Sequence, residues 1–430
     1  MDSNLRNRIF WMLSLLFVFK LGVHIPTPGI DGIALSEFFS KNASNTVFGL
    51  FNMFSGGALE QLSLFGLGIG PYISASIIMQ LATVMFPSVE KIQKEGESGR
   101  RKITQWTRYL AVAIALVQGF SIATGLEGQT SPDTQAPIVL DPGMLFRVKT
   151  MILLTTGSIF VMWLGEQITE KGIGNGSSLI IFTGIASSLM AGAGRLKLAV
   201  QNDSMTVPMV VILLGIMVVV VAFIVFVEQG QRRIPIQYAR RMVGRKIYGG
   251  QDSHLPLKLN SAGVIPPIFA STLVMFPATI LSFFSNHDWA IRFKDLFTPS
   301  GFGFNVLYVL GIFFFCFFYT AVTVNPNDLA ENLKKFGGYV PGIRPGKHTS
   351  DFFNSIITRL TFSGAIYLSA VCVLPSILIS TFNVDFHFGG TTLLILVGVA
   401  LDTMSQIQAH LISQNYDSFL KQARLRGRRV

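Results

Sequence analysis

Hydrophobic residues in this chain are gathered into long runs that polar and charged segments separate. A helix needs about 20 mostly apolar residues to cross the hydrocarbon core of a membrane. Ten runs come close to that length, which predicts an all-α polytopic membrane protein with ten transmembrane helices and both chain ends on one side. The runs lie at about 9–26, 62–86, 108–124, 147–165, 174–193, 207–227, 263–284, 304–324, 356–379 and 389–412.

Composition supports this assignment. Half of the 430 residues are hydrophobic and only 13% are charged, which is about half the charged fraction of soluble proteins. The two cysteines, Cys316 and Cys372, lie inside apolar runs. We therefore expect two buried thiols rather than a disulfide framework.

Positive charge is distributed unevenly between the two sides that ten crossings define. Of the 34 Lys and Arg residues, 26 fall at the N-terminus, in the C-terminal tail and in the loops after the even-numbered runs, and 7 fall on the other side. Cytoplasmic segments of membrane proteins carry such an excess. We expect both termini and the basic loops to be cytoplasmic.

A short apolar segment at 47–59, VFGLFNMFSGGAL, follows the first run and contains the pair Gly56-Gly57. It is too short to cross a membrane. The residues alone leave two interpretations open: an element that re-enters the bundle, where surrounding protein satisfies its irregular backbone, or a helix that lies in the membrane interface.

Two glycine-rich stretches adjoin predicted helices. The stretch GLGIGP at 66–71 predicts a bend or a helix start, and GIGNGS at 172–177 predicts a turn with Asn175 or Ser177 as the helix cap. Neither has the spacing or the strand-helix context of a nucleotide-binding loop.

Two loops on the basic side stand out. The loop at about 229–258 predicts a short hairpin that turns near Gly244. The loop at about 325–355 predicts a helix that starts at Asn325-Pro326, and then presents Arg344 between Pro-Gly pairs. Such loops suit a charged contact with a partner protein, and equally the attraction of cytoplasmic positive charge to anionic lipids.

Ionisable residues are scarce within the predicted spans. Lys20 and Asp402 are the clear cases, while Glu166, Glu228 and Arg359 lie near span ends. Asp402 is the only candidate proton carrier for a secondary transporter. The six His residues have no metal-ligand spacing and no catalytic grouping can be assembled, so we expect no enzyme, no metal site and no cofactor.

Six motifs, in order along nearly the whole chain, resemble the bacterial SecY family. They are NMFSGGAL at 52–59, PYISASI at 71–77, EGESGRRK at 95–102, WLGEQIT at 163–169, GQRRI at 230–234 and PGIRPG at 341–346.

The resemblance implies two inverted, pseudo-symmetric halves of five spans each, at 1–193 and 194–430, hinged between the fifth and sixth spans. It also implies that about 51–62 forms a plug beneath a pore constriction, which favours the re-entrant interpretation. The plug residues of the matching motif are Asn52, Met53, Phe54, Ser55, Gly56, Gly57, Ala58 and Leu59.

The resemblance assigns further residues to sites. The pore ring would comprise Ile69, Ile73, Ile181, Ile268 and Ile395, and Ser177 stands where many members have a sixth aliphatic residue. The lateral gate, between the second and seventh spans, would carry Ser74, Gln80 and Asn260. Docking of a motor or ribosome would use Arg232, Arg240, Arg241 and Arg344.

The function that the resemblance implies is a channel in the bacterial inner membrane. It would pass unfolded secretory polypeptides and release hydrophobic segments sideways into lipid. The implied partners are the small subunits SecE and SecG, the SecA motor ATPase, the ribosome, signal sequences and nascent chains, and anionic lipids. The alternative is an ion-coupled transporter of a small solute that works through Asp402.

Overall fold

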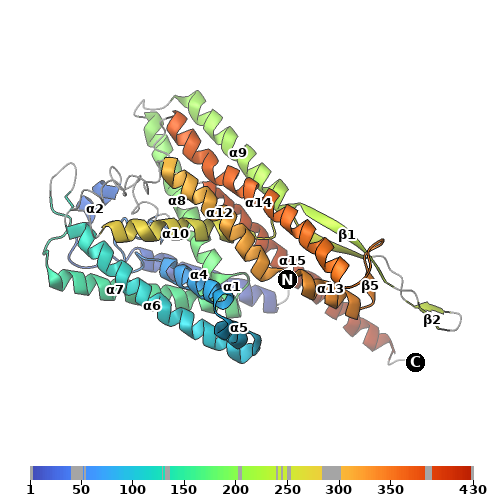
Figure 1. Ribbon diagram of the computed structural model, residues 1–430. Coiled ribbons are helices and arrows are strands. Elements are labelled where there is room, and N and C mark those ends of the chain that lie inside the picture. The colour runs from blue at the N-terminus through green and yellow to red at the C-terminus, as the bar shows by residue number, and fades with distance from the viewer. Residues whose placement is uncertain are drawn as a thin grey trace.

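The computed structural model is mostly helical (Figure 1). It describes residues 3–39, 52, 55–127, 129–130, 136–201, 206–238, 241–243, 246–248, 253–282, 302–382 and 390–427. Each of the ten predicted apolar runs overlaps one helix within this part of the chain. The helices are α1 (Ser3–Val23), α2 (Gly32–Phe38), α4 (Gly70–Met85), α5 (Pro87–Lys94), α6 (Glu97–Glu127), α7 (Met144–Lys171), α8 (Gly176–Gln201), α9 (Val207–Gln229), α10 (Ile265–Ser282), α12 (Phe302–Thr323), α13 (Pro326–Lys335), α14 (Lys347–Phe382) and α15 (Gly390–Gly427).

The number of membrane spans is lower than ten when length and apolarity alone are counted. In the described residues, 6 helical stretches pass on their own, and a seventh passes if α4 and α5, bent by 101° at Phe86, count as one span. The helices α8 and α10 contribute shorter apolar stretches, Gly176–Met190 and Ile265–Val274. The helices establish a multi-pass protein, and this count does not confirm ten spans.

Helix boundaries follow local chemistry. The helix α4 begins at Gly70 with Pro71 in its first turn, so the predicted helix start is confirmed, although the apolar run itself begins earlier, in turns. Asn175 is the cap of α8, because its Oδ1 accepts hydrogen bonds from the backbone N–H groups of Ser177 and Ser178 at 3.0 and 3.4 Å. Asn325 caps α13 in the same way, through the N–H of Asn327 at 3.0 Å.

Strands form only a small part of the described chain. The strands β1 (Gln231–Tyr238), β4 (Ser253–Lys258) and β5 (Gly338–Tyr339) form an antiparallel sheet in the order β4-β1-β5. The strands β2 (Arg241–Val243) and β3 (Lys246–Tyr248) pair as a separate hairpin. The predicted hairpin around Gly244 is therefore confirmed. Because β5 pairs with β1, the sheet joins the two basic loops.

The helices pack in two groups that meet along two seams. One group contains α1, α4, α6, α7 and α8, and the other contains α9, α10, α12, α14 and α15. The helix α4 contacts α10 at one seam, and α8 contacts α15 at the other. Figure 1 shows α10 between α4 and α6 on one side and α12 on the other.

Glycines allow several close crossings of these helices. A Cβ added at Gly176 would lie 1.9 Å from the carbonyl oxygen of Gly165 in α7, whereas one added at Gly215 in α9 would meet nothing within 4 Å.

We predict that Gly176→Ala lowers the free energy of unfolding by about 1–3 kcal/mol, because overpacking at a rigid backbone forces the two helices apart. Gly215→Ala is the matched control and should be neutral or slightly stabilising, since alanine favours helix. Thermal unfolding of the purified protein in detergent measures both. Equal midpoints for the two variants would contradict the predicted close crossing.

Candidate functional site

Five isoleucines from four separate helical elements gather in one apolar cluster. Ile69, Ile181, Ile268 and Ile395 are between 0% and 6% exposed and belong to one apolar cluster, against which the partly buried Ile73 packs. We call these five side chains the isoleucine collar. They come from the start of α4 and from α8, α10 and α15, so both seams contribute to the collar.

The collar consists only of aliphatic side chains, which offer no hydrogen bonds to water, ions or a peptide backbone. Its neighbours in the same cluster are also apolar, including Phe19 and Phe65, whose rings stack with centroids 6.0 Å apart. An apolar cluster of this kind excludes water and makes weak contacts that lack direction. Ser177 is not among the members of the cluster in the described part of the chain.

The segment before α4 is folded on itself. We call residues 52–62 the plug segment, of which Asn52 and residues 55–62 are described. The Asn52 side chain makes two bonds to Glu60: its Oδ1 accepts the Glu60 N–H at 2.9 Å, and its Nδ2 donates to the Glu60 carboxylate at 3.3 Å. The backbone oxygen of Asn52 accepts the Gly57 N–H at 2.9 Å. Gly56 and Gly57 have φ of 72° and 86°, which a side chain would disfavour. Met53 and Phe54 lie outside the described residues.

The described end of the plug segment, residues 55–62, lies among the helices of the bundle. A Cβ added at Gly184 of α8 would lie 2.9 Å from the Cα of Gly56, so two glycine backbones touch. Ala58 is fully buried and shares the apolar cluster of the collar. Leu59 and Leu62 are also fully buried, in a second cluster with α2, α6 and α7. This burial favours the element lodged among helices over the helix in the membrane interface.

A strained residue terminates the plug segment. Leu62 has φ of 34°, which is unfavourable for a residue with a Cβ. Its carbonyl oxygen accepts two bonds from Thr27, from the N–H at 3.0 Å and from Oγ1 at 2.8 Å. These contacts fix the end of the segment to the chain that leads from α1 to α2.

The three predicted gate residues are not brought together. The helices α4 and α10 do touch, and Ile77 of α4 shares a cluster with Ala270 and Val274 of α10. In the described chain, however, Ser74 bonds the Gly70 oxygen at 3.1 Å and Gln80 bonds Ser76 at 3.4 Å, both within α4.

Asn260 also differs from the expectation. It is 3% exposed and lies before α10, where it donates to Glu228 at the end of α9 at 2.7 Å. The cluster that α4 and α10 share is apolar, the bonds of Ser74 and Gln80 stay within α4, and the bond of Asn260 leads to α9.

Two of the four arginines predicted to dock partners are described and exposed. Arg232 on β1 and Arg344 after β5 are exposed. Gly342 and Gly346 flank Arg344 with φ of 79° and 110°, and the Arg344 carbonyl accepts a bond from Thr349 Oγ1 at 3.0 Å. Arg240 lies outside the described residues, as does the side chain of Arg241.

A separate apolar cluster supports the sheet β4-β1-β5. Ile234 of β1, Val340 after β5, and Phe353 and Ile356 of α14 are buried together, with Leu329 and Leu333 of α13 packed against them. We call the sheet β4-β1-β5 with α13 the basic platform. It carries Arg232 and Arg344 on one rigid unit.

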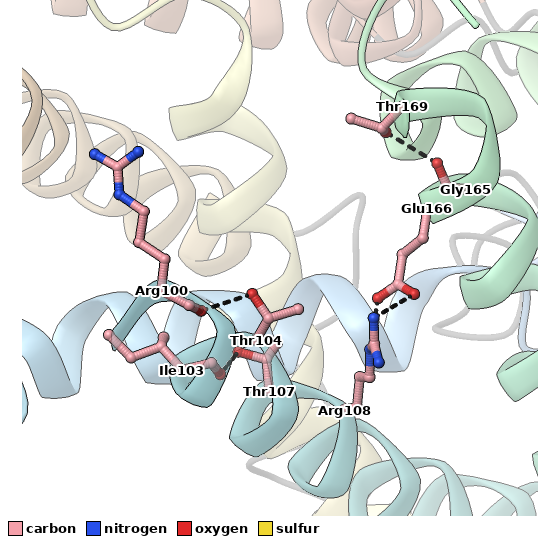
Figure 2. A network of polar contacts seen from close by, with 8 residues as sticks. All are labelled: Arg100, Ile103, Thr104, Thr107, Arg108, Gly165, Glu166 and Thr169. Carbon is pink, nitrogen blue, oxygen red and sulfur yellow. Dashed lines mark hydrogen bonds and ion pairs between the residues drawn. The ribbon is translucent and has the colours of Figure 1, made fainter. Parts of the chain in front are cut away.

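Charged groups near the spans are paired. The Arg108 guanidinium and the Glu166 carboxylate form two hydrogen bonds, of 2.8 and 2.9 Å, between α6 and α7, as Figure 2 shows. Lys20 donates to Ser187 at 2.5 Å. The side chain of Asp402 is 62% exposed and lies 3.7 Å from Lys258. In the described residues, no three His, Cys, Asp or Glu side chains are placed to hold a metal ion.

The sequence did not indicate these long-range pairs. Arg108 and Glu166 are 58 positions apart, and Glu228 and Asn260 are 32 apart. No local pattern distinguishes them from other charges near span ends. Only the packing of α6 on α7, and of α9 beside the start of α10, reveals the pairs.

Comparisons with known proteins agree with one another. The SecY family model matches residues 63–404. The protein translocase subunit SecY of Escherichia coli K12 is 47% identical over 430 residues, covering 99% of this chain and 96% of that protein. The subunit of the same name from Vibrio cholerae is 45% identical over 431 residues, with the same coverage.

Solved structures show the same fold. A structure described as a protein conducting channel superposes with a TM-score of 0.70 at 16% identity, covering 96% of this chain and 94% of that one. Sec61 in a canine ribosome-channel complex gives 0.64 at 15% identity, with the same coverage. This chain belongs to the SecY family.

Proposed function

We infer that the chain forms a protein-conducting channel through which unfolded polypeptides cross the membrane. The observation that carries this inference is the isoleucine collar, in which isoleucines from four elements of both helix groups gather in one apolar cluster. The relatives named protein translocase subunit SecY support the same function.

The collar and the plug segment would act in series. A hole wide enough for a polypeptide would also pass ions, unless apolar walls expel water from the empty pore. The plug segment would complete the closure, because Ala58 packs on the collar cluster and Gly56 touches α8. An entering chain would displace the plug segment and take its place against the collar.

The proposed architecture has ten spans in two inverted halves, divided near residue 193. The two packing groups and their seams support this division. The seam between α4 and α10 would serve as the lateral gate, because the apolar cluster that Ile77 and Val274 share across it can be replaced by an equally apolar signal segment. Transfer of about 20 apolar residues from water to lipid would drive the release.

The basic platform would dock cytoplasmic partners. Exposed arginines on a supported surface suit the phosphates of ribosomal RNA and acidic protein surfaces. The solved Sec61 and Ssh1 channels are described in complexes with ribosomes. We extend this docking to the SecA motor, and we place SecE, SecG and anionic lipids around the spans. The charge asymmetry supports a bacterial inner-membrane location with both termini cytoplasmic.

The transporter alternative has no support. A coupling acid needs a site near the membrane midplane that binds and releases its proton away from bulk water. Asp402 is mostly exposed and has Lys258 beside it at the base of β4. A solvent-exposed, ion-paired carboxylate does not suit that role.

The collar generates the first prediction. Ile395→Asn should raise the ionic current of the resting channel several-fold in planar bilayers, because a buried amide hydrates the constriction. Ile395→Leu, which keeps volume and apolarity, is the control and should stay closed. Equal currents from both variants would contradict the collar.

The contact between the plug segment and α8 generates the second prediction. In Gly184→Ala the new Cβ would press on Gly56, and an overpacking cost of about 1.4 kcal/mol would raise the open probability about tenfold. Gly194→Ala is the matched control on the same helix, because a Cβ there meets nothing within 4 Å. Single-channel recording compares the two. If both variants gate as the parent does, the seat of the plug segment is not at Gly184.

The basic platform generates the third prediction. Arg344→Glu should abolish motor-driven export in reconstituted vesicles while the protein still inserts and stays folded, because the reversed charge repels an acidic partner surface. Arg344→Lys should retain part of the activity, and Arg101→Glu, at an 80% exposed position on α6, should retain all of it. Normal export by Arg344→Glu would exclude the docking role.

A further inference from the structure

We call the chain from the start of β1 to the end of β4 the basic arm. Its two ends meet at one junction. The chain leaves α9 after Gln229, forms the arm from β1 to β4, and returns at Lys258 toward α10. Figure 1 shows α9 leading directly into β1 along one edge of the molecule. The arm packs on α14 through the cluster that supports the basic platform, and this junction is its connection along the chain to α9 and α10.

The backbone at the junction is tightly connected. The β1-β4 ladder ends with Gln231 opposite Lys258, and the Leu259 N–H then donates to the Gly230 oxygen at 2.9 Å. A Cβ added at Gly230 would lie 2.3 Å from Leu259 Cδ1. The sheet therefore continues to the last residue before Asn260.

A side-chain contact closes the junction. The Nδ2 group of Asn260 donates to Glu228 Oε1 at 2.7 Å. Asn260 is 3% exposed, and Glu228 is partly buried. A hydrogen bond that is shielded from water is costly to break, because its groups are left without a partner.

Asn260 also fixes the start of the seam helix α10. Its Nδ2 donates to the Gly263 oxygen at 3.0 Å, and its Oδ1 accepts the Gly263 N–H at 3.1 Å. Gly263 has φ of 65° and lies two residues before α10 begins at Ile265. One amide thus holds the turn that sets the direction of α10 and bonds the end of α9.

We propose that Glu228 is a positioning residue: its carboxylate holds Asn260, so that the basic arm and the start of α10 move as one unit and partner binding on the arm reaches the seam between α4 and α10. The proposal rests on the function proposed above. Loss of the Glu228 contact removes the side-chain bond between α9 and the turn at 260–263, which favours separation of α10 from α4 without a partner.

A second polar contact at the same junction provides a matched control. Lys258 and Asp402 lie 3.7 Å apart, but their side chains are 64% and 62% exposed. Exposed pairs contribute little to stability. Asp402→Asn therefore removes a carboxylate from the same junction without removing a buried contact.

The first experiment uses the full complex in vesicles with its motor. The measured quantity is the translocation rate of a substrate with a shortened apolar signal segment, divided by the rate with the full segment. We expect Glu228→Leu to raise this ratio about tenfold, since loss of about 1.4 kcal/mol of closed-state stabilisation changes the equilibrium constant between the closed and open seam by that factor. Glu228→Gln keeps an acceptor oxygen and should restore most of the parent behaviour, and Asp402→Asn should match the parent.

The second experiment reads the seam without translocation. Spin labels at Ile78 of α4 and Leu273 of α10, which are 44% and 49% exposed, report the distance across the seam. The native thiols Cys316 and Cys372 are replaced by alanine. We expect a longer-distance population in Glu228→Leu without a partner, and in the parent only when the partner is bound.

The outcomes separate the two proposals. Active translocation with an unchanged ratio and unchanged distances in Glu228→Leu would overturn the positioning role and leave the channel function intact. Absence of translocation by the parent protein would instead count against the channel function. If Glu228→Leu does not fold, the distance measurement on Asn260→Ser, whose shorter side chain loses the same contact, decides the question, and parent-like distances there reject the proposal.

Discussion

Apolar contact across two seams is the interaction on which this structure depends. The isoleucine collar is assembled from elements of both helix groups, so it exists only while the groups stay together. Aliphatic side chains attract one another through many weak contacts without directional bonds. In the proposed channel, a ring of such side chains would close without binding water or ions and would part without leaving an unpaired polar group. The same property allows a passing segment of almost any sequence to replace the contacts that it disrupts.

Apolar contacts have no preferred direction, so they do not by themselves fix where the plug segment lies. Close contacts that only glycine permits define its position. The backbone of Gly56 lies against that of Gly184, and a Cβ at Gly157 would lie 1.8 Å from the Leu64 oxygen. Glycine permits an approach that any side chain would prevent. The strained Leu62, held by both hydrogen bonds from Thr27, fixes one end of the plug segment. The plug segment therefore has one defined seat, although few polar contacts hold it there.

The sequence predicted features that depend on neighbours along the chain. Apolar runs located the helices, Pro71 marked the start of α4, and Asn175 capped α8 as its position suggested. Contacts between distant positions were beyond such patterns. Asn260 was expected in the seam between α4 and α10, yet its partner is Glu228, because the arm returns the chain to the end of α9. The collar residues were assigned from the family resemblance, and periodicity alone would not have selected them among many buried isoleucines.

Polar contacts in this molecule divide according to burial, and this division bears on how a signal crosses the structure. Exposed pairs such as Lys258 with Asp402 exchange readily with water, so their geometry transmits little force. The contact of Glu228 with Asn260 is shielded from water. The Asn260 side chain also makes two hydrogen bonds within the turn that precedes α10. Behind it, the basic platform is stiffened by its own apolar cluster. A supported sheet that is joined to the start of a helix through a shielded hydrogen bond is suited to bias a seam whose own contacts are apolar and lack direction.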